Sequence, residues 1–203
     1  MKQLFSKLMA FAALAVVFSA MTGCGGVQSS NTNANNTATN ASAQKQPGSS
    51  DYPPLASGLA DAEVEMLDGT KIKISDKKGK VLLINIWGTW CGPCIAEMPH
   101  LIALQNEHGE QGFEVIGLNI GDGGGSPEPL NDIKEFVAKQ KLNYTIAIAS
   151  NAVTNQFYLI TKQQVVPQTI LVDRAGKLRG VFVGGGPRIF SSMKQNVEKV
   201  MAE

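Results

Sequence analysis

The clearest structural signal in the chain is the run Val81-Leu-Leu-Ile-Asn-Ile-Trp87-Gly-Thr-Trp90-Cys91-Gly-Pro-Cys94. Its first seven residues are almost all apolar, which predicts a central strand covered on both faces. The two cysteines follow directly, where a helix over residues 91–108 is expected to begin. A Cys-x-x-Cys pair in this position is typical of a redox motif.

The spacing of Cys91 and Cys94 has a chemical reason. Residues three apart on a first helical turn are neighbours, so two thiols there can close and reopen a small disulfide ring with little backbone movement. The unpaired amides and dipole of the helix N-terminus stabilise a thiolate on Cys91, the expected nucleophile, and leave Cys94 as the resolving thiol. Zinc binding would need further ligands at compatible spacing, and c-type haem attachment would need a histidine where Ile95 stands.

Glu97 lies on the same helical stripe as Cys94, and the stripe continues through Leu101 and Leu104. The two leucines mark this stripe as facing the core. A carboxyl group there is poorly solvated, so its pKa should rise, and it could exchange a proton with Cys94. The alternative is an exposed first-turn glutamate favoured by the helix dipole.

The remaining sequence predicts an α/β sandwich with a mixed sheet. An Asp-Gly turn at Asp68-Gly69 predicts a hairpin. Apolar spacing and turn signals give the elements in the following order: strands 63–66, 71–74 and 81–87, helix 91–108, strand 113–120, helix 130–142, strand 144–149, helix 153–160, strands 169–172 and 178–183, and helix 189–201.

Composition narrows the function further. The 203 residues carry a formal net charge of +1. A protein that binds nucleic acid usually carries a large excess of basic residues, so this charge does not favour nucleic-acid binding. The length suits one globular domain plus extras. The chain has three cysteines, too few for a multi-disulfide scaffold. With only two histidines besides them, it has almost no ligands to spare for a structural zinc site.

The N-terminus predicts export and anchoring. Residues 1–23 have a basic start and an apolar run, Leu8–Phe18, that is too short to span a bilayer, which indicates a signal peptide. The sequence Met21-Thr22-Gly23-Cys24 resembles the bacterial lipoprotein box, which implies lipidation of Cys24. The alternative is an ordinary secretory peptide with an incidental cysteine, and either leader takes the protein out of the cytoplasm.

Three segments are therefore expected: a lipoprotein signal peptide over residues 1–23, a lipidated cysteine with a flexible polar tether over 24–50, and a folded domain over 51–203. The anchor would hold the protein on a membrane, facing the periplasm or the cell exterior. Gly25 is not the aspartate associated with inner-membrane retention, so the sorting rule favours the outer membrane in a two-membrane bacterium.

The segment Trp87-Gly-Thr-Trp-Cys-Gly-Pro-Cys-Ile-Ala-Glu-Met-Pro99 resembles the active-site signature of the thioredoxin superfamily, and more closely that of its membrane-anchored TlpA/ResA-like thiol-disulfide oxidoreductases. The resemblance implies a thioredoxin-like sandwich with an N-terminal hairpin and an inserted helix-strand unit, here Leu130–Ala149. In thioredoxins a buried aspartate stands where this chain has Asn85, which leaves Glu97 as the proton relay. Val166-Pro167 matches the family's cis-proline position. The residues expected to bind substrate are Trp90, Gly92, Pro93, Val166 and Pro167.

The expected activity is dithiol-disulfide exchange without a metal or organic cofactor, mainly in the direction of reduction. The resemblance implies a membrane thiol transporter of the CcdA/DsbD type as electron donor and apocytochrome c or its maturation partners as substrates. We expect a monomer.

Two other functions on the same fold stay open. A peroxiredoxin-like peroxide reductase would carry a Pro-x-x-x-Thr-x-x-Cys motif, but Ile84 stands at the proline position before Cys91 and Gly88, after Trp87, at the threonine position. A non-catalytic, copper-delivering lipoprotein would need a Cys-x-x-x-Cys pair and a histidine between residues 166 and 186, where none stands.

Overall fold

The computed structural model describes residues 51–203. The predicted signal peptide, the lipidation of Cys24 and the tether lie outside the described residues. Within residues 51–203, every helix is too short or too polar to span a bilayer.

A seven-stranded mixed sheet forms the centre of this region, with the strand order β2-β1-β5-β4-β3-β6-β7. Strand β3 pairs in parallel with β4 and antiparallel with β6. Every residue of β3, β4 and β6 is buried, which agrees with the largely apolar sequences of these strands. The strands are β1 (Glu63–Met66), β2 (Lys71–Lys73), β3 (Val81–Trp87), β4 (Phe113–Asn119), β5 (Thr145–Ile148), β6 (Gln168–Val172) and β7 (Leu178–Val183).

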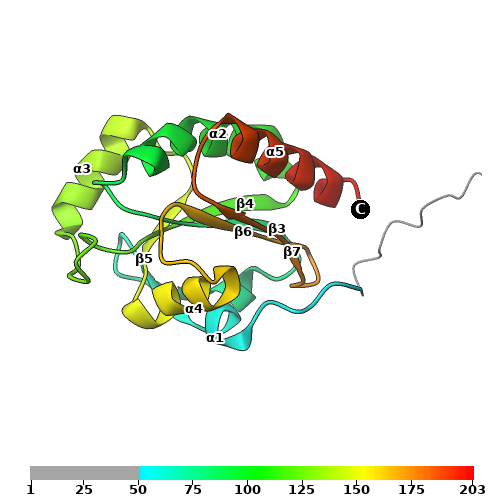
Figure 1. Cartoon of the computed structure of the whole chain (residues 1–203), viewed down its shortest axis with the longest axis horizontal. Coiled ribbons are helices and arrows are strands. Elements are labelled where there is room, and N and C mark those ends of the chain that lie inside the picture. Colours follow the sequence, from blue (N-terminus) through cyan, green and yellow to red (C-terminus); the bar gives the residue numbers. More distant parts are fainter. Residues whose placement is uncertain (1–50) are drawn as a thin grey trace, which may run out of the picture. The chain divides into compact units, whose positions relative to one another are not determined.

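Helices cover both faces of the sheet (Figure 1). Helices α2 (Gly92–His108), α3 (Leu130–Gln140) and α5 (Pro187–Met201) lie on one face, where they share an apolar core with alternate residues of β3 and β4. Helices α1 (Ser57–Ala60) and α4 (Asn151–Thr161) cover the other face and form a second core. The observed architecture is the α/β sandwich that the sequence predicts.

The predicted elements are all present, and their ends agree with the prediction to within two residues. Helix α4 begins earlier than expected because the hydroxyl of Ser150 accepts a hydrogen bond from the amide of Val153 and caps the helix. Helix α5 begins at Pro187, whose fixed φ suits a first helical turn. The short helix α1 and the single 3-10 turns at Ile74–Lys77 and Gly109–Gln111 were not predicted, because so few residues show no periodicity.

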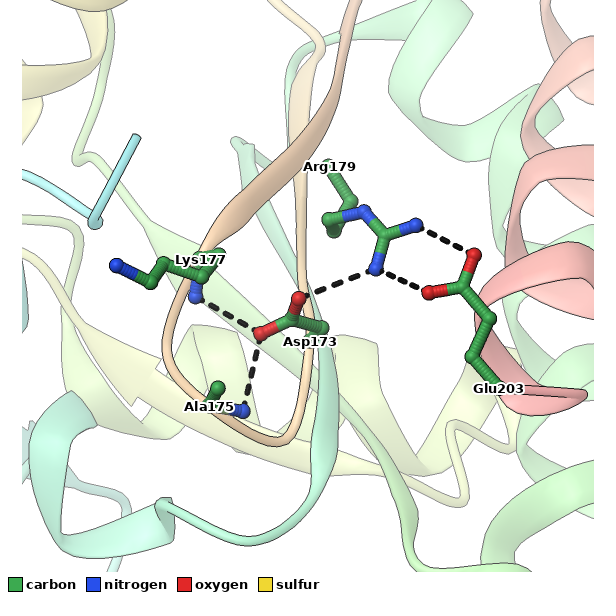
Figure 2. Close-up of polar contacts among 5 residues, drawn as sticks. All are labelled: Asp173, Ala175, Lys177, Arg179 and Glu203. Carbon is green, nitrogen blue, oxygen red and sulfur yellow. Dashed lines mark hydrogen bonds and ion pairs between the residues drawn. The ribbon is translucent and has the colours of Figure 1, made fainter. Parts of the chain in front are cut away.

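An ion-pair cluster ties the C-terminus to the turn between β6 and β7 (Figure 2). The guanidinium of Arg179 donates to both carboxylate oxygens of Glu203, at 2.6 and 2.7 Å, and to Asp173 at 3.1 Å. The other oxygen of Asp173 accepts from the amides of Ala175 and Lys177. The turn and the end of α5 are thus held by one buried arginine side chain.

Candidate functional site

Cys91 and Cys94 form a disulfide at the N-terminal end of α2. Strand β3 ends at Trp87, and Cys91 is the N-cap of the helix, where its sulfur accepts from the amide of Cys94 at 3.2 Å. Gly92 and Pro93 are exposed between the two cysteines, whereas Cys94 is only 1% exposed. Cys91, at 4% exposed, is the N-cap and Cys94 lies within the first turn, an order that suits attack by Cys91 and resolution by Cys94.

Glu97 lies one turn further along α2 and is only 1% exposed. The core-facing position inferred from the helical stripe is therefore confirmed. Loss of solvation raises the pKa of Glu97 from about 4.5 to about 7, although hydrogen bonds from Thr169 and Asn85 partly oppose the rise. This carboxyl group can gain or lose a proton near neutral pH, as a proton relay must.

The hydrogen bonds of Glu97 come from two neighbouring strands. Asn85 of β3 donates from Nδ2 to Glu97 Oε2 at 3.0 Å and to Thr169 Oγ1 at 2.9 Å, and Thr169 of β6 lies 3.4 Å from Glu97 Oε1. Asn85 and Thr169 are paired across the sheet. Thr169 was not singled out by the sequence, because it is 72 residues from Glu97 and no local pattern marks the contact.

The peptide bond between Val166 and Pro167 is cis, as the family resemblance implied. The carbonyl oxygen of Pro167 accepts from the amide of Gly184 at 2.9 Å. The next residue, Gly185, approaches Pro93 so closely that an added Cβ would lie 3.4 Å from the proline ring. The Gly184–Gly186 turn therefore brings the cis-proline segment and the active-site loop together.

Trp90 is 49% exposed beside Cys91, but its ring is firmly held. Its Nε1 donates to the carbonyl oxygen of Gly121 at 2.7 Å. Two glycines make room for the indole: an added Cβ would lie 2.6 Å from the ring at Gly88 and 2.9 Å from it at Gly123. The glycine cluster after β4, which the sequence indicated only as the end of a strand, thus forms part of the site.

The five residues expected to bind substrate fall into two groups. Gly92, Pro93 and Trp90 belong to the exposed loop at the start of α2, and the half-buried Val166 precedes the buried Pro167 in the cis-proline segment. Gly185 lies within van der Waals distance of Pro93, and its neighbour Gly184 is hydrogen-bonded to Pro167, so the two groups are linked through this turn. Among residues 51–203, no three His, Cys, Asp or Glu side chains come together in a way that could hold a metal ion.

Comparison with known proteins gives a family model and curated relatives. The model described as Redoxin matches residues 33–201. Thiol-disulfide oxidoreductase ResA of Geobacillus thermodenitrificans is 28% identical over 146 residues, which are 72% of this chain and 78% of that protein. ResA of Halalkalibacterium halodurans is 34% identical over 122 residues, 60% of this chain and 64% of the relative.

Solved structures agree with the observed architecture. A thiol:disulfide interchange protein of the thioredoxin family from Chlorobium tepidum matches with a TM-score of 0.60 and 23% identity, over 74% of this chain and 97% of that one. A thiol:disulfide interchange protein from a Bacteroides species matches with a TM-score of 0.56 and 22% identity, over 71% and 91%. At these identities the likeness concerns the fold, which is thioredoxin-like as predicted.

Proposed function

Because the chain belongs to the Redoxin family and is a thiol-disulfide oxidoreductase, we propose that it reduces disulfides in other proteins outside the cytoplasm. The observation that carries this proposal is the Cys91–Cys94 disulfide at the start of α2, with the buried carboxyl group of Glu97 behind it. The Gly-Pro dipeptide between the cysteines, which thioredoxin shares, favours reduction.

The reaction starts from the reduced pair. The thiolate of Cys91 attacks one sulfur of the substrate disulfide, forms a mixed disulfide and releases the other substrate sulfur as a thiolate, which takes up a proton. The thiolate of Cys94 then attacks the sulfur of Cys91 and displaces the second substrate thiolate. Two electrons have moved to the substrate, and the pair is left as the disulfide that the structure holds.

Glu97 serves the second step as a base. The Cys94 thiol must lose its proton before it can attack, and little water reaches a sulfur that is 1% exposed. Glu97 lies one helical turn away and has a pKa of about 7, so its carboxylate can accept that proton near neutral pH. Regeneration of the reduced pair returns the proton to the sulfur.

The substrate segment lies across the surface formed by the two groups of binding residues. Trp90 offers an exposed indole face beside the nucleophile. Pro93 lies close to Gly185, and the neighbouring Gly184 donates its amide to the carbonyl oxygen of Pro167, which follows Val166. The exposed residues Trp90, Gly92 and Pro93 suit a disulfide in a locally extended chain better than one held inside a compact fold.

The partners and location follow from the sequence. We propose that lipidated Cys24 anchors the protein on a bacterial membrane, that a thiol transporter of the CcdA/DsbD type supplies electrons, and that apocytochrome c or its maturation partners are substrates. The protein acts as a monomer and needs no cofactor besides its own disulfide. The motif Met21-Thr22-Gly23-Cys24 and the signature Trp87–Pro99 support these assignments.

The midpoint potential of the Cys91–Cys94 pair tests the direction of the reaction. The purified full chain is equilibrated in defined thiol buffers, and the fraction of disulfide is measured by thiol alkylation. A potential near that of thioredoxin, about −270 mV, supports a reductase. A potential near that of DsbA, about −120 mV, would instead indicate an oxidant and contradict the proposal.

A further inference from the structure

The segment of residues 162–166 connects α4 to the cis-proline. Residues 162–165 are exposed, including the apolar side chain of Val165 at 48%. No backbone-to-backbone hydrogen bond joins residues 163–166 to any other part of the described chain. The position of this segment therefore depends on side chains.

Gln168 supplies most of that support from inside the protein. Its side chain is fully buried, and its Nε2 donates to the carbonyl oxygens of Gln163 at 2.9 Å and Val165 at 2.7 Å. Its Oε1 accepts from the hydroxyl of Thr161 at 3.0 Å, and that hydroxyl in turn accepts from the amide of Gln163. Both amide hydrogens and the amide oxygen of Gln168 are thus used to hold one surface loop.

The backbone of Gln168 is itself fixed in the sheet. It pairs with Ile86 in β3 and with Val183 in β7. Ile86 lies next to Trp87, the last residue of the strand that leads to Cys91. The buried amide therefore couples the exposed loop to the central strands of the sheet, and a pre-formed binding surface loses less entropy when a partner binds.

We propose that Gln168 is a positioning residue for polypeptide substrates. It holds residues 162–166, and with them Val166, in the conformation that accepts an extended chain beside the nucleophilic cysteine. The loop offers backbone groups for hydrogen bonds, and Val165 offers an apolar contact for a side chain near the substrate cysteine. This inference rests on the proposed function and specifies the substrate as an extended polypeptide rather than a small disulfide.

The test replaces Gln168 by methionine, which keeps the length of the side chain and removes its hydrogen bonds. Gln105→Met is the matched control, because the Gln105 side chain also accepts a hydrogen bond, from the amide of Val115 at 2.8 Å, but lies outside the loop. Each full-chain variant is assayed with insulin as a polypeptide disulfide and with glutathione disulfide as a small one, and the midpoint potential is measured.

For Gln168→Met, we expect KM for insulin to rise about fivefold or more, because a loop without these hydrogen bonds must be ordered when the polypeptide binds. The kcat for insulin, the rate with glutathione disulfide and the potential should stay close to those of the wild type. Gln105→Met should leave KM unchanged. Thr161→Val, at a half-buried helix end, should raise KM in the same direction and provides a readout that does not depend on folding of the Gln168 variant.

Two results would overturn the inference: an unchanged KM for insulin in both loop variants, or an equal loss of rate on insulin and on glutathione disulfide. The second result would mean that Gln168 supports the whole site rather than polypeptide binding. A wild-type chain that reduces neither substrate would contradict the proposed function itself, which separates the two failures.

Discussion

The amide of Asn85 donates a 3.0 Å hydrogen bond to the carboxyl group of Glu97, and both side chains are buried. An amide does not titrate, so within this pair only Glu97 can hold or release a proton near neutral pH. Glu97 belongs to α2, one helical turn after Cys94, whereas Asn85 belongs to β3. The titratable group of this pair therefore lies on the helix that carries Cys94 and not on the strand.

Glu97→Gln should slow the step in which Cys94 resolves the mixed disulfide. The variant cannot accept the Cys94 proton, so we expect a loss of about 100-fold above pH 7 and loss of the inflection near that pH. Release of the second substrate thiol is followed by stopped-flow from pH 5 to 9. Glu107→Gln, on the exposed part of the same helix, is the control. An unchanged pH profile in Glu97→Gln would exclude the proton relay.

The same residue should make stability fall as pH rises. The pKa of Glu97 is about 7 in the folded protein and about 4.5 ordinarily, so between these values the folded chain keeps a proton that the unfolded chain has released. Stability is therefore full below about pH 4.5 and declines until the pH passes the folded value.

Glu97→Gln stays neutral at every pH and should lose this decline, which amounts to about 1–3 kcal/mol between pH 5 and pH 8. Urea unfolding of the oxidised wild type and variant at both pH values measures the difference. Parallel pH dependence in the two proteins would mean that burial does not control the ionisation of Glu97.

Local patterns were sufficient to predict the cysteine pair and the burial of Glu97. The 3-4-3 spacing of Cys94, Glu97, Leu101 and Leu104 repeats on one helical face, and all four side chains are buried. The almost entirely apolar sequence of β3 likewise predicted its central place in the sheet. These features depend on the spacing of residues within a single helix or strand, so they can be recognised from the sequence alone.

Contacts between distant segments could not be predicted in this way. Thr169 reaches Glu97, and Gly121 accepts from the indole of Trp90, across 72 and 31 residues respectively. These pairs depend on which strands become neighbours and on how a loop folds back. No repeating pattern in the sequence indicates either contact. The glycine cluster therefore predicted only the end of a strand.

Gly123→Ala should disturb substrate binding through Trp90. An added Cβ at Gly123 would lie 2.9 Å from the indole, whereas at Gly125 it would meet nothing within 4 Å. Both glycines have positive φ, 80° and 94°, so Gly125→Ala is a matched control that carries the same backbone strain without the clash.

We expect Gly123→Ala to raise KM for insulin about fivefold and to change the tryptophan fluorescence spectrum, while Gly125→Ala changes neither. The expected size of the rise in KM follows from the cost of displacing an aromatic side chain at a binding surface. Equal effects of the two variants would show that strain in the loop, and not the position of Trp90, controls binding.

Arg179→Met should destabilise the domain without changing its redox chemistry. The Arg179 side chain is 2% exposed between Asp173 and Glu203, whose hydrogen bonds raise its pKa and keep it charged. Methionine removes the charged hydrogen bond from Arg179 to the buried carboxylate of Asp173, which costs about 2 kcal/mol. Urea unfolding of the oxidised protein measures this loss.

Arg174→Met is the control, because Arg174 is exposed and makes one 3.4 Å hydrogen bond to the carbonyl oxygen of Gln111. We expect its stability to stay within about 0.5 kcal/mol of the wild type. Asp173 directly follows the residue of β6 that pairs with Leu82, near the start of β3. The cysteines follow the other end of β3, so the midpoint potential should not change in either variant. If both variants lost equal stability, the buried ion-pair cluster would not be what holds the C-terminus to the β6–β7 turn.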